Sequence, residues 1–240
     1  MDVMNMVKEY LREVAQFHRI LEERVSIKAR PLSPEEVIGN PEEGDYPLLK
    51  GRERMMQAEF KGFCGQAFTD MFGNYEASLS DIISMEMTNN FRRAILISTL
   101  NVVMRCFNGL KGTIHCKDND PRTCSEELCN YIYNRFGKIK IAMVGFQPRM
   151  VEALSKRFEL RVTDMDPDNV GKEKFSIKIE GPEKTAENLK WADLSLVTGT
   201  TFINNTYNEI IGKKALLFYG VTASGVSAIT GFERFCPCGR

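Results

Sequence analysis

The stretch Lys138-Ile-Lys-Ile-Ala-Met-Val-Gly145-Phe-Gln-Pro-Arg-Met150 decides the fold, together with Leu160-Arg-Val-Thr-Asp164-Met-Asp166 further along the chain. The pattern predicts an apolar strand that ends at Gly145, a helix that begins behind Pro148, and a second strand that ends in acidic residues. Asp164 follows Gly145 by about 20 residues, which is the spacing of a dinucleotide-type βαβ unit. In that unit a carboxylate at the end of the second strand accepts hydrogen bonds from a ribose diol.

The turn after the first strand is poor in glycine. Gly145-Phe-Gln-Pro-Arg has one glycine where the full dinucleotide fingerprint has three, so a pyrophosphate has less room to approach the backbone. S-adenosylmethionine, which has a ribose but no pyrophosphate, fits this turn at least as well as NAD does. A ligand without a nucleotide fits it equally well.

The hydrophobic periodicity and turn signals of the first 137 residues predict a domain of mixed helices and strands. Breaker residues predict a surface loop over residues 31–47. A capping-box pattern, Thr123-Cys-Ser-Glu126, predicts a helix that begins at Thr123 and ends at Gly137. Periodicity predicts the other elements, which are a helix (4–23), a strand (24–29), two extended segments (55–61 and 63–71) and a long core helix (89–108).

Beyond Gly137, strands alternate with helices, which predicts a parallel sheet covered on both faces. We therefore expect an α/β fold, with an α+β domain over residues 1–137 and a parallel-sheet domain over residues 138–240. The expected strands are 139–144, 160–163, 194–197 and 215–219, with a short strand or turn near 175–179. The expected helices include 148–157, 185–190 and 205–211.

Composition restricts the class of partner. Lysine and arginine together number 32, as do aspartate and glutamate, so no net charge favours nucleic acid or an anionic membrane. No apolar run approaches the roughly 20 residues of a membrane helix, and the amino terminus has no signal-like core, so we expect a cytoplasmic protein. The expected partner is a small molecule or a metal, with no nucleic acid and no membrane, and a homodimer is one possible oligomeric state.

Four of the predicted strands end in small or polar residues. Because parallel strands bind ligands beyond their carboxyl ends, these four loops are expected to form one site. Ser, Thr and Asn also cap helices, so helix capping is the structural alternative for part of this set. The candidate ligand-binding residues are Gly145, Gln147, Asp164, Asp166, Thr198, Gly199, Thr200, Thr201, Asn204, Asn205, Gly220 and Thr222.

The seven cysteines are an odd number without the spacing of a disulfide scaffold, so we expect thiols, metal ligands or core residues. Thiolate and imidazole are the soft ligands that suit zinc, copper and nickel. No Cys-x-x-Cys pair is present, so burial in the core remains an alternative for each cysteine. The candidate metal ligands are His115, Cys116, Cys124, Cys236 and Cys238.

A third segment, Lys61-Gly-Phe-Cys-Gly-Gln-Ala-Phe-Thr-Asp70, has the pattern of a turn between extended pieces. Its polar residues Lys61, Gln66 and Asp70 could line a cleft against the second domain. The alternative is that they satisfy the backbone of the turn.

These motifs together resemble the putative heavy-metal chelation family, which is known mainly from anaerobic bacteria and archaea. The resemblance implies an amino-terminal domain similar to the enolase amino-terminal domain, a Rossmann-like carboxyl-terminal domain, and a site in the cleft between them. It rests on the segment 61–70, on Asn89-Asn-Phe-Arg-Arg-Ala-Ile95 with Thr99-Leu-Asn101, on Val144-Gly-Phe-Gln-Pro148 and on Val197-Thr-Gly-Thr-Thr-Phe-Ile-Asn-Asn-Thr206.

Two functions from different classes follow. The first is the binding of a transition metal, or of a metal-containing small molecule, in the interdomain cleft. The second is an enzyme of cofactor biosynthesis, similar to a methyltransferase, that uses S-adenosylmethionine or NAD with Asp164 or Asp166 on the ribose. A further interpretation makes Cys236-Pro-Cys238 an exposed redox dithiol. No catalytic residue is assigned, and catalysis itself stays open.

Overall fold

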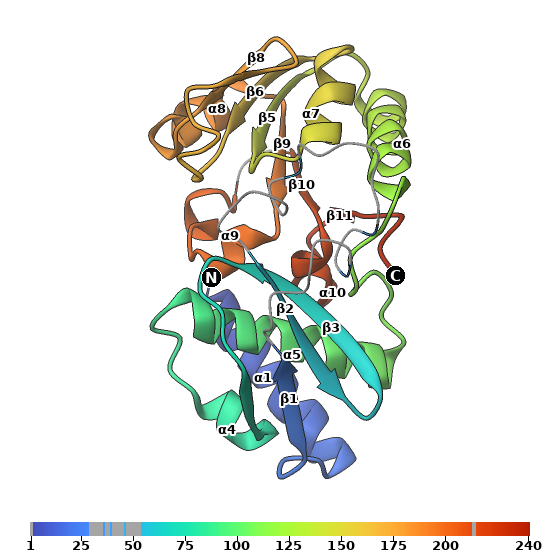
Figure 1. The fold of residues 1–240 in the computed structure, drawn as a ribbon, viewed down its shortest axis with the longest axis vertical. Coiled ribbons are helices and arrows are strands. Elements are labelled where there is room, and N and C mark those ends of the chain that lie inside the picture. Colours follow the sequence, from blue (N-terminus) through green and yellow to red (C-terminus); the bar gives the residue numbers. More distant parts are fainter. Residues whose placement is uncertain (1, 29–35, 37–38, 40–45, 47–53, 213–214) are drawn as a thin grey trace.

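The computed structural model describes residues 2–28, 36, 39, 46, 54–212 and 215–240. Within them the chain forms two sheets, one in each half of the molecule (Figure 1). The predicted loop over residues 31–47 lies, apart from residues 36, 39 and 46, outside the described residues.

The first sheet is antiparallel, with the strand order β3-β2-β1-β4. Its strands are β1 (Arg24–Lys28), β2 (Arg54–Phe60), β3 (Phe63–Thr69) and β4 (Tyr75–Ser78). The helices of the described residues that accompany it are α1 (Val3–His18), α4 (Leu79–Ser84) and α5 (Asn90–Asn108).

Helix α5 is the central element of this half. It begins where the Asn89 side chain accepts the Arg92 backbone N–H, and it ends at Gly109 with a left-handed φ of 66°. Its residues 93–104 are buried on all sides, because β2 and β3 cover one face while α1 and α10 (Ser224–Thr230) cover others. The predicted core helix over 89–108 is confirmed.

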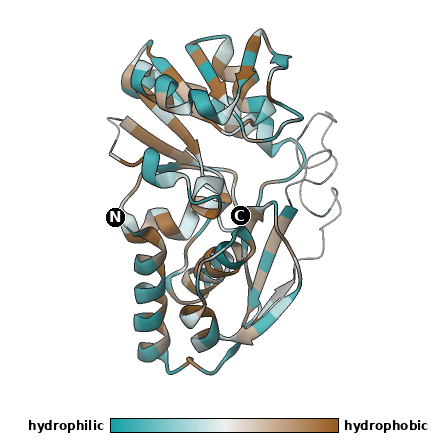
Figure 2. Cartoon of the chain, turned by 90° about the vertical axis from the view of Figure 1, so that its left-hand side faces the viewer, coloured by the Kyte–Doolittle hydropathy of each residue, from teal (hydrophilic) through white to brown (hydrophobic). Residues whose placement is uncertain are grey.

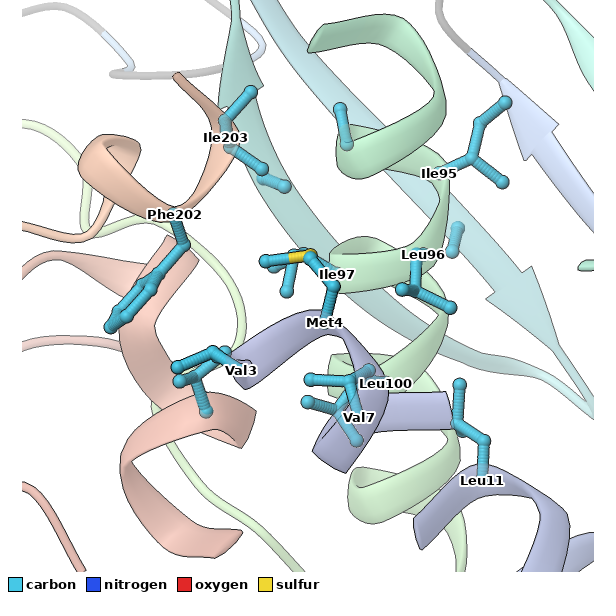
Figure 3. Close-up of a cluster of buried hydrophobic side chains, with 14 of the residues drawn as sticks. Val3, Met4, Val7, Leu11, Ile95, Leu96, Ile97, Leu100, Phe202 and Ile203 are labelled. Carbon is cyan, nitrogen blue, oxygen red and sulfur yellow. The ribbon is translucent and has the colours of Figure 1, made fainter. Parts of the chain in front are cut away.

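The hydrophobic cluster around α1 and α5, which we call the first core, contains residues from both halves of the chain. Figure 3 shows Val3, Val7 and Leu11 of α1 packed near Leu96, Ile97 and Leu100 of α5, with Phe202 and Ile203 approaching from the second half. Each of these side chains is buried in one hydrophobic cluster. The first sheet and its helices therefore depend on carboxyl-terminal residues for their packing.

The second sheet has the strand order β11-β10-β9-β5-β6-β8-β7. All neighbouring strands pair in parallel except β7 and β8, which form an antiparallel hairpin at one edge. The strands are β5 (Lys140–Val144), β6 (Glu159–Thr163), β7 (Glu173–Lys174), β8 (Ile177–Glu180), β9 (Leu194–Thr198), β10 (Ala215–Tyr219) and β11 (Arg234–Phe235). The predicted α/β fold with a parallel carboxyl-terminal sheet is confirmed.

The strand order reverses direction at β5. The chain moves from β5 to β6 on one side, and then returns to place β9 on the other side of β5. Loops that leave β5 and β9 therefore diverge at a topological switch point, where open α/β sheets form a crevice for ligands.

The helices that follow α5 in the described residues are α6 (Asp120–Phe136), α7 (Pro148–Ser155), α8 (Thr185–Trp191), α9 (Thr200–Ile203) and α10, with the short 3-10 helices η1 (Pro182–Lys184), η2 (Tyr207–Glu209) and η3 (Val221–Ala223). None of the helices in the described part of the chain has the length and apolar character needed to span a bilayer.

The two halves interlock. Helix α6 precedes Gly137, yet its buried Leu128 and Ile132 share a cluster with Val151 of α7 and with the strands of the second sheet. Conversely, Val226 of α10 packs in the first core. The division at Gly137 thus separates the two sheets but not the two cores, and it stays a prediction.

Three predicted helices have wrong bounds. The helix predicted over 4–23 ends at His18, because Arg19 has a left-handed φ of 56°. Helix α6 begins at Asp120 with Pro121 in its first turn, so Thr123 lies inside the helix and is not its cap. The helix predicted over 205–211 is replaced by α9 and η2, because Asn205 has a left-handed φ of 58° that a right-handed helix cannot continue.

Candidate functional site

A pocket of about 230 Å³ opens at the carboxyl ends of β5, β6, β9 and β10. Phe68 of β3 also lines it, so both sheets contribute to its wall. The four strand-end loops come together, as the sequence predicted. Of the candidate residues, those that line the pocket are Gly145, Gln147, Asp164, Asp166, Thr198, Thr200, Thr201, Asn204, Gly220, Thr222, His115, Cys116, Cys124 and Cys236.

Gly145 is the point at which three strand ends converge. Its φ of 95° favours glycine, and a Cβ there would lie 2.7 Å from Thr198 Cγ2 and 2.8 Å from the Tyr219 hydroxyl. The Tyr219 hydroxyl donates a hydrogen bond to the Gly145 carbonyl oxygen at 2.8 Å. Glycine is therefore needed here for close packing of the ends of β5, β9 and β10.

Asp164 holds the loop after β5 against the loop after β6. One carboxylate oxygen accepts the Phe146 backbone N–H at 2.6 Å, and the other accepts the Asp166 backbone N–H at 2.7 Å. Burial raises the pKa of the Asp164 carboxyl, while these two amide bonds act in the opposite direction. A ribose diol at this position would have to compete with two backbone donors.

The amino terminus of α7 is closed by its own residues. Gln147 is the N-cap, and its side-chain oxygen accepts the Met150 backbone N–H at 2.6 Å. Pro148 follows it and has no N–H to offer. In dinucleotide-binding folds these helix amides bind a pyrophosphate, so two of the usual donors are not available here.

The loop after β9 uses its hydroxyls mainly for local structure. The Thr201 hydroxyl donates to the Thr198 carbonyl oxygen at 2.8 Å, and the Thr198 and Thr200 hydroxyls lie 3.1 Å apart. After β10, the Thr222 hydroxyl accepts the Phe68 backbone N–H at 3.0 Å. These threonines shape the pocket wall, and helix capping does not account for their bonds, because the N-caps of α9 and η3 are Gly199 and Gly220, which have no side-chain cap bond.

Sulfur and imidazole groups also line the pocket. We call this set the thiol wall, and it comprises His115, Cys116, Cys124 and Cys236. His115 Nδ1 lies 2.6 Å from the Cys116 carbonyl oxygen, so Nδ1 carries the proton and Nε2 is the basic nitrogen. Metal-binding histidines are commonly oriented by this kind of backbone contact.

Burial raises the pKa of the Cys116 and Cys124 thiols, and negative charge on Cys236 and Cys238 would raise both further. The thiols therefore keep their protons at neutral pH. Because these sulfur atoms affect one another electrostatically, they lie close together in the fold. Cys116 and Cys124 thus meet Cys236 and Cys238, which are more than a hundred residues away in the sequence. Cys129 lies apart and contacts the Ala153 carbonyl oxygen.

The carboxyl-terminal tail is fastened beside the thiol wall. Ile114 and Arg240 exchange two backbone hydrogen bonds of 2.9 Å, and the Arg240 guanidinium pairs with Asp120 at 3.0 Å. This places Cys236 against the pocket, whereas Cys238 packs beside it against the second core without lining it.

Within the described residues, no three His, Cys, Asp or Glu side chains are grouped closely enough to hold a metal ion as they stand. The thiol wall can supply one or two soft ligands, which is fewer than a structural zinc site requires. The residues present therefore suit a metal that brings part of its own ligand set.

The remaining candidates lie away from the lining. Lys61 pairs with Glu23 at 3.0 Å in the first half, and Gly199 packs closely on Ala223. Asn205 is exposed.

Gln66 and Asp70 act on the pocket indirectly. The buried Gln66 accepts the His115 backbone N–H at 2.7 Å and so supports the thiol wall. Asp70 accepts a bond from Asn90, which also donates to Asn204 at the pocket.

The sequence interpretation missed several lining residues. Tyr219 ends β10, so the strand-end rule that selected Gly220 could have found it. Phe68 and Thr185 reach the pocket through tertiary packing, and no local sequence pattern signals that.

Residues 130–228 match a family model described as putative heavy-metal chelation, which confirms the resemblance drawn from the motifs. A solved protein of unknown function of that family, from Pyrococcus horikoshii, is similar with a TM-score of 0.59 at 16% identity, over 92% of this chain and 80% of that chain. Another, from Desulfitobacterium hafniense, has a TM-score of 0.50 at 10% identity, over 74% of this chain and 72% of that chain. At these identities the likeness shows the fold alone. No curated protein matches the chain.

Proposed function

We propose that this chain, whose residues 130–228 match the putative heavy-metal chelation family, binds a transition metal as part of a metal-containing small molecule. The proposed site is the pocket at the carboxyl ends of β5, β6, β9 and β10. The observation that carries the proposal is that one pocket is lined both by thiols and an imidazole and by hydroxyl, amide and carboxylate groups. We place the protein in the cytoplasm, where reducing conditions keep cysteines as thiols.

The thiol wall and the polar strand-end groups would contact different parts of the bound molecule. Thiolates bind soft and borderline metals such as copper, zinc and nickel, so Cys116 and Cys124 are the expected metal ligands. The polar strand-end groups, among them Asn204 and Asp166, would contact the rest of the molecule. A single ion would fill a small part of the 230 Å³ pocket, which supports a larger occupant.

Replacement of Cys116 and Cys124 together by serine should weaken nickel binding by about a hundredfold, because serine oxygen is a poor ligand for a borderline metal. Affinity for Ni²⁺ and Zn²⁺ is measured by competition with a chromophoric chelator, on full-length protein purified without oxygen. Metal analysis of the protein as isolated gives a second readout.

Cys129→Ser is the matched control, since Cys129 lies on the same helix as Cys124 and is similarly buried but does not line the pocket. Circular dichroism establishes that all variants are folded. Unchanged metal affinity and content in the folded double variant, or an equal loss in Cys129→Ser, would contradict the proposal.

Metal affinity should rise with pH. Because burial raises the pKa of both thiols, each must lose a proton to bind the metal, and the affinity increases up to about tenfold per pH unit for each proton released. When both thiolates bind the metal, the affinity should rise by up to about a hundredfold for each pH unit across the neutral range. Calorimetry in buffers of different ionisation enthalpy counts the protons, and a flat profile between pH 6 and 8 would argue against thiolate binding.

The alternative function is a nucleotide-dependent enzyme of cofactor biosynthesis, similar to a methyltransferase. It is favoured by Asp166, which follows β6 and lines the pocket near the position of a ribose-binding acid. Calorimetry with S-adenosylhomocysteine and NAD tests it. Heat with either ligand that is lost in Asp166→Ala would favour the alternative, and no heat at protein concentrations that detect weak binding would remove it.

A further inference from the structure

The carboxylates of the pocket lining carry negative charge that no lining cation offsets. Among the described residues that line the pocket, the carboxylates are Asp164, Asp166 and Glu209, and neither lysine nor arginine is present. None of the described ion pairs involves these three carboxylates. A concave surface with uncompensated negative charge attracts cations and repels anions.

The three carboxylates differ in how far their charge is already stabilised. Asp164 accepts hydrogen bonds from the backbone N–H groups of Phe146 and Asp166, so the protein already stabilises part of its negative charge. Asp166 accepts one backbone N–H, from Asp168 at 2.9 Å, and Glu209 lies exposed on η2. Asp166 and Glu209 therefore have the greatest capacity to interact with a bound charge.

Two arginines approach the lining without belonging to it. The Arg234 guanidinium donates a hydrogen bond to the Cys236 thiol, and the Arg149 guanidinium lies 5.9 Å from the centre of the Tyr46 ring. Arg149 shares Glu152 with Lys156, at 2.8 and 3.0 Å. These cations offset part of the negative charge near Cys236 and Tyr46, and the lining itself carries the three carboxylates.

We infer that the occupant of the pocket is positively charged: a cationic metal complex whose own ligands are neutral donors such as amines, rather than an anionic carboxylate or phosphate chelate. This inference rests on the proposed function and specifies its ligand class. The thiol wall faces the metal, while Asp166 and Glu209 receive the charged periphery of the complex. The same charges disfavour polyphosphate nucleotides.

Two nickel complexes of matched shape test the inference. Tris(2-aminoethyl)amine and nitrilotriacetate are both tripodal, tetradentate ligands that leave two nickel positions open for thiols. The first complex carries two positive charges and the second one negative charge. Full-length protein purified without oxygen is titrated with each complex at about 20 mM salt and again at about 200 mM salt.

The cationic complex should bind about a hundredfold more tightly at the lower salt, and the ratio should shrink at the higher salt. Asp166→Asn and Glu209→Gln should each reduce the ratio about fivefold to tenfold. Asp168→Asn is the matched control, because Asp168 is exposed in the same turn but does not line the pocket. It should change the ratio less than about twofold.

Equal or tighter binding of the anionic complex would overturn the inference while leaving the proposed function intact. A cationic preference that survives both pocket substitutions would also overturn it, because the charge would then act from elsewhere. Binding of neither complex would overturn the proposed function itself.

Discussion

Replacement of Gly65 by alanine should destabilise the protein by about 3 kcal/mol or more, because β3 and α5 approach each other without room for a side chain. A Cβ at Gly65 would overlap the Val102 backbone nitrogen and lie 2.7 Å from the Ser98 carbonyl oxygen. Both atoms belong to the backbone of a buried helix that cannot shift alone. The free energy of unfolding is measured by chemical denaturation.

Gly73→Ala is the control for this prediction. A Cβ at Gly73 would meet only the Phe91 ring at 3.5 Å, an ordinary contact, so the expected change is within about 0.5 kcal/mol. Equal effects of the two substitutions would show that β3 does not pack on α5 as closely as described here.

Asn101→Ala should destabilise the protein by about 3 kcal/mol, because its fully buried amide makes three hydrogen bonds across three elements. Its Nδ2 donates to the Gln66 and Val221 carbonyl oxygens at 2.8 and 3.1 Å, and its Oδ1 accepts the Gly225 N–H at 2.7 Å. Truncation removes the acceptor of the buried Gly225 N–H and a donor to each of two buried carbonyl oxygens, of which the Val221 oxygen keeps its bonds from Ser224, and it opens a cavity. Thermal and urea denaturation measure the loss.

Ser98→Ala is the matched control on the same helix. Ser98 is equally buried, but its hydroxyl bonds only to the Ala94 and Ile95 carbonyl oxygens of its own helix. Those oxygens already accept backbone bonds within the helix, so the expected change is below about 1 kcal/mol. A loss in Asn101→Ala no larger than in Ser98→Ala would mean that the bonds to β3, η3 and α10 add little stability.

The parts of the fold that could be predicted are those with a local cause. Apolar runs that end in Gly145, Asp164 and Thr198 predicted the parallel strands, and the strand-end rule then placed their loops around one pocket. The hydropathy colouring in Figure 2 shows this apolar pattern, with hydrophobic residues concentrated in the strands and on inward helix faces.

The parts that could not be predicted depend on contacts between distant residues. The earlier start of α6 at Asp120 is not one of these parts, because Pro121 in its first turn is a local signal that competes with the capping pattern around Thr123. Nothing local shows that Cys236 meets Cys116 and Cys124, because the tail is positioned by its pairing with Ile114. The thiols were identified by residue type, and their convergence required the three-dimensional fold.

The exchange of helices between the two cores makes each half a poor candidate for separate expression. A fragment that stops after Gly137 would leave the α6 face formed by Leu128 and Ile132 open to water, and it would lack the Phe202 and Val226 side chains that complete its own centre. Such pieces are expected to aggregate when made singly and to recover solubility when made together. A split version of the chain would thus report on reassembly, since the pocket regenerates only when both fragments meet.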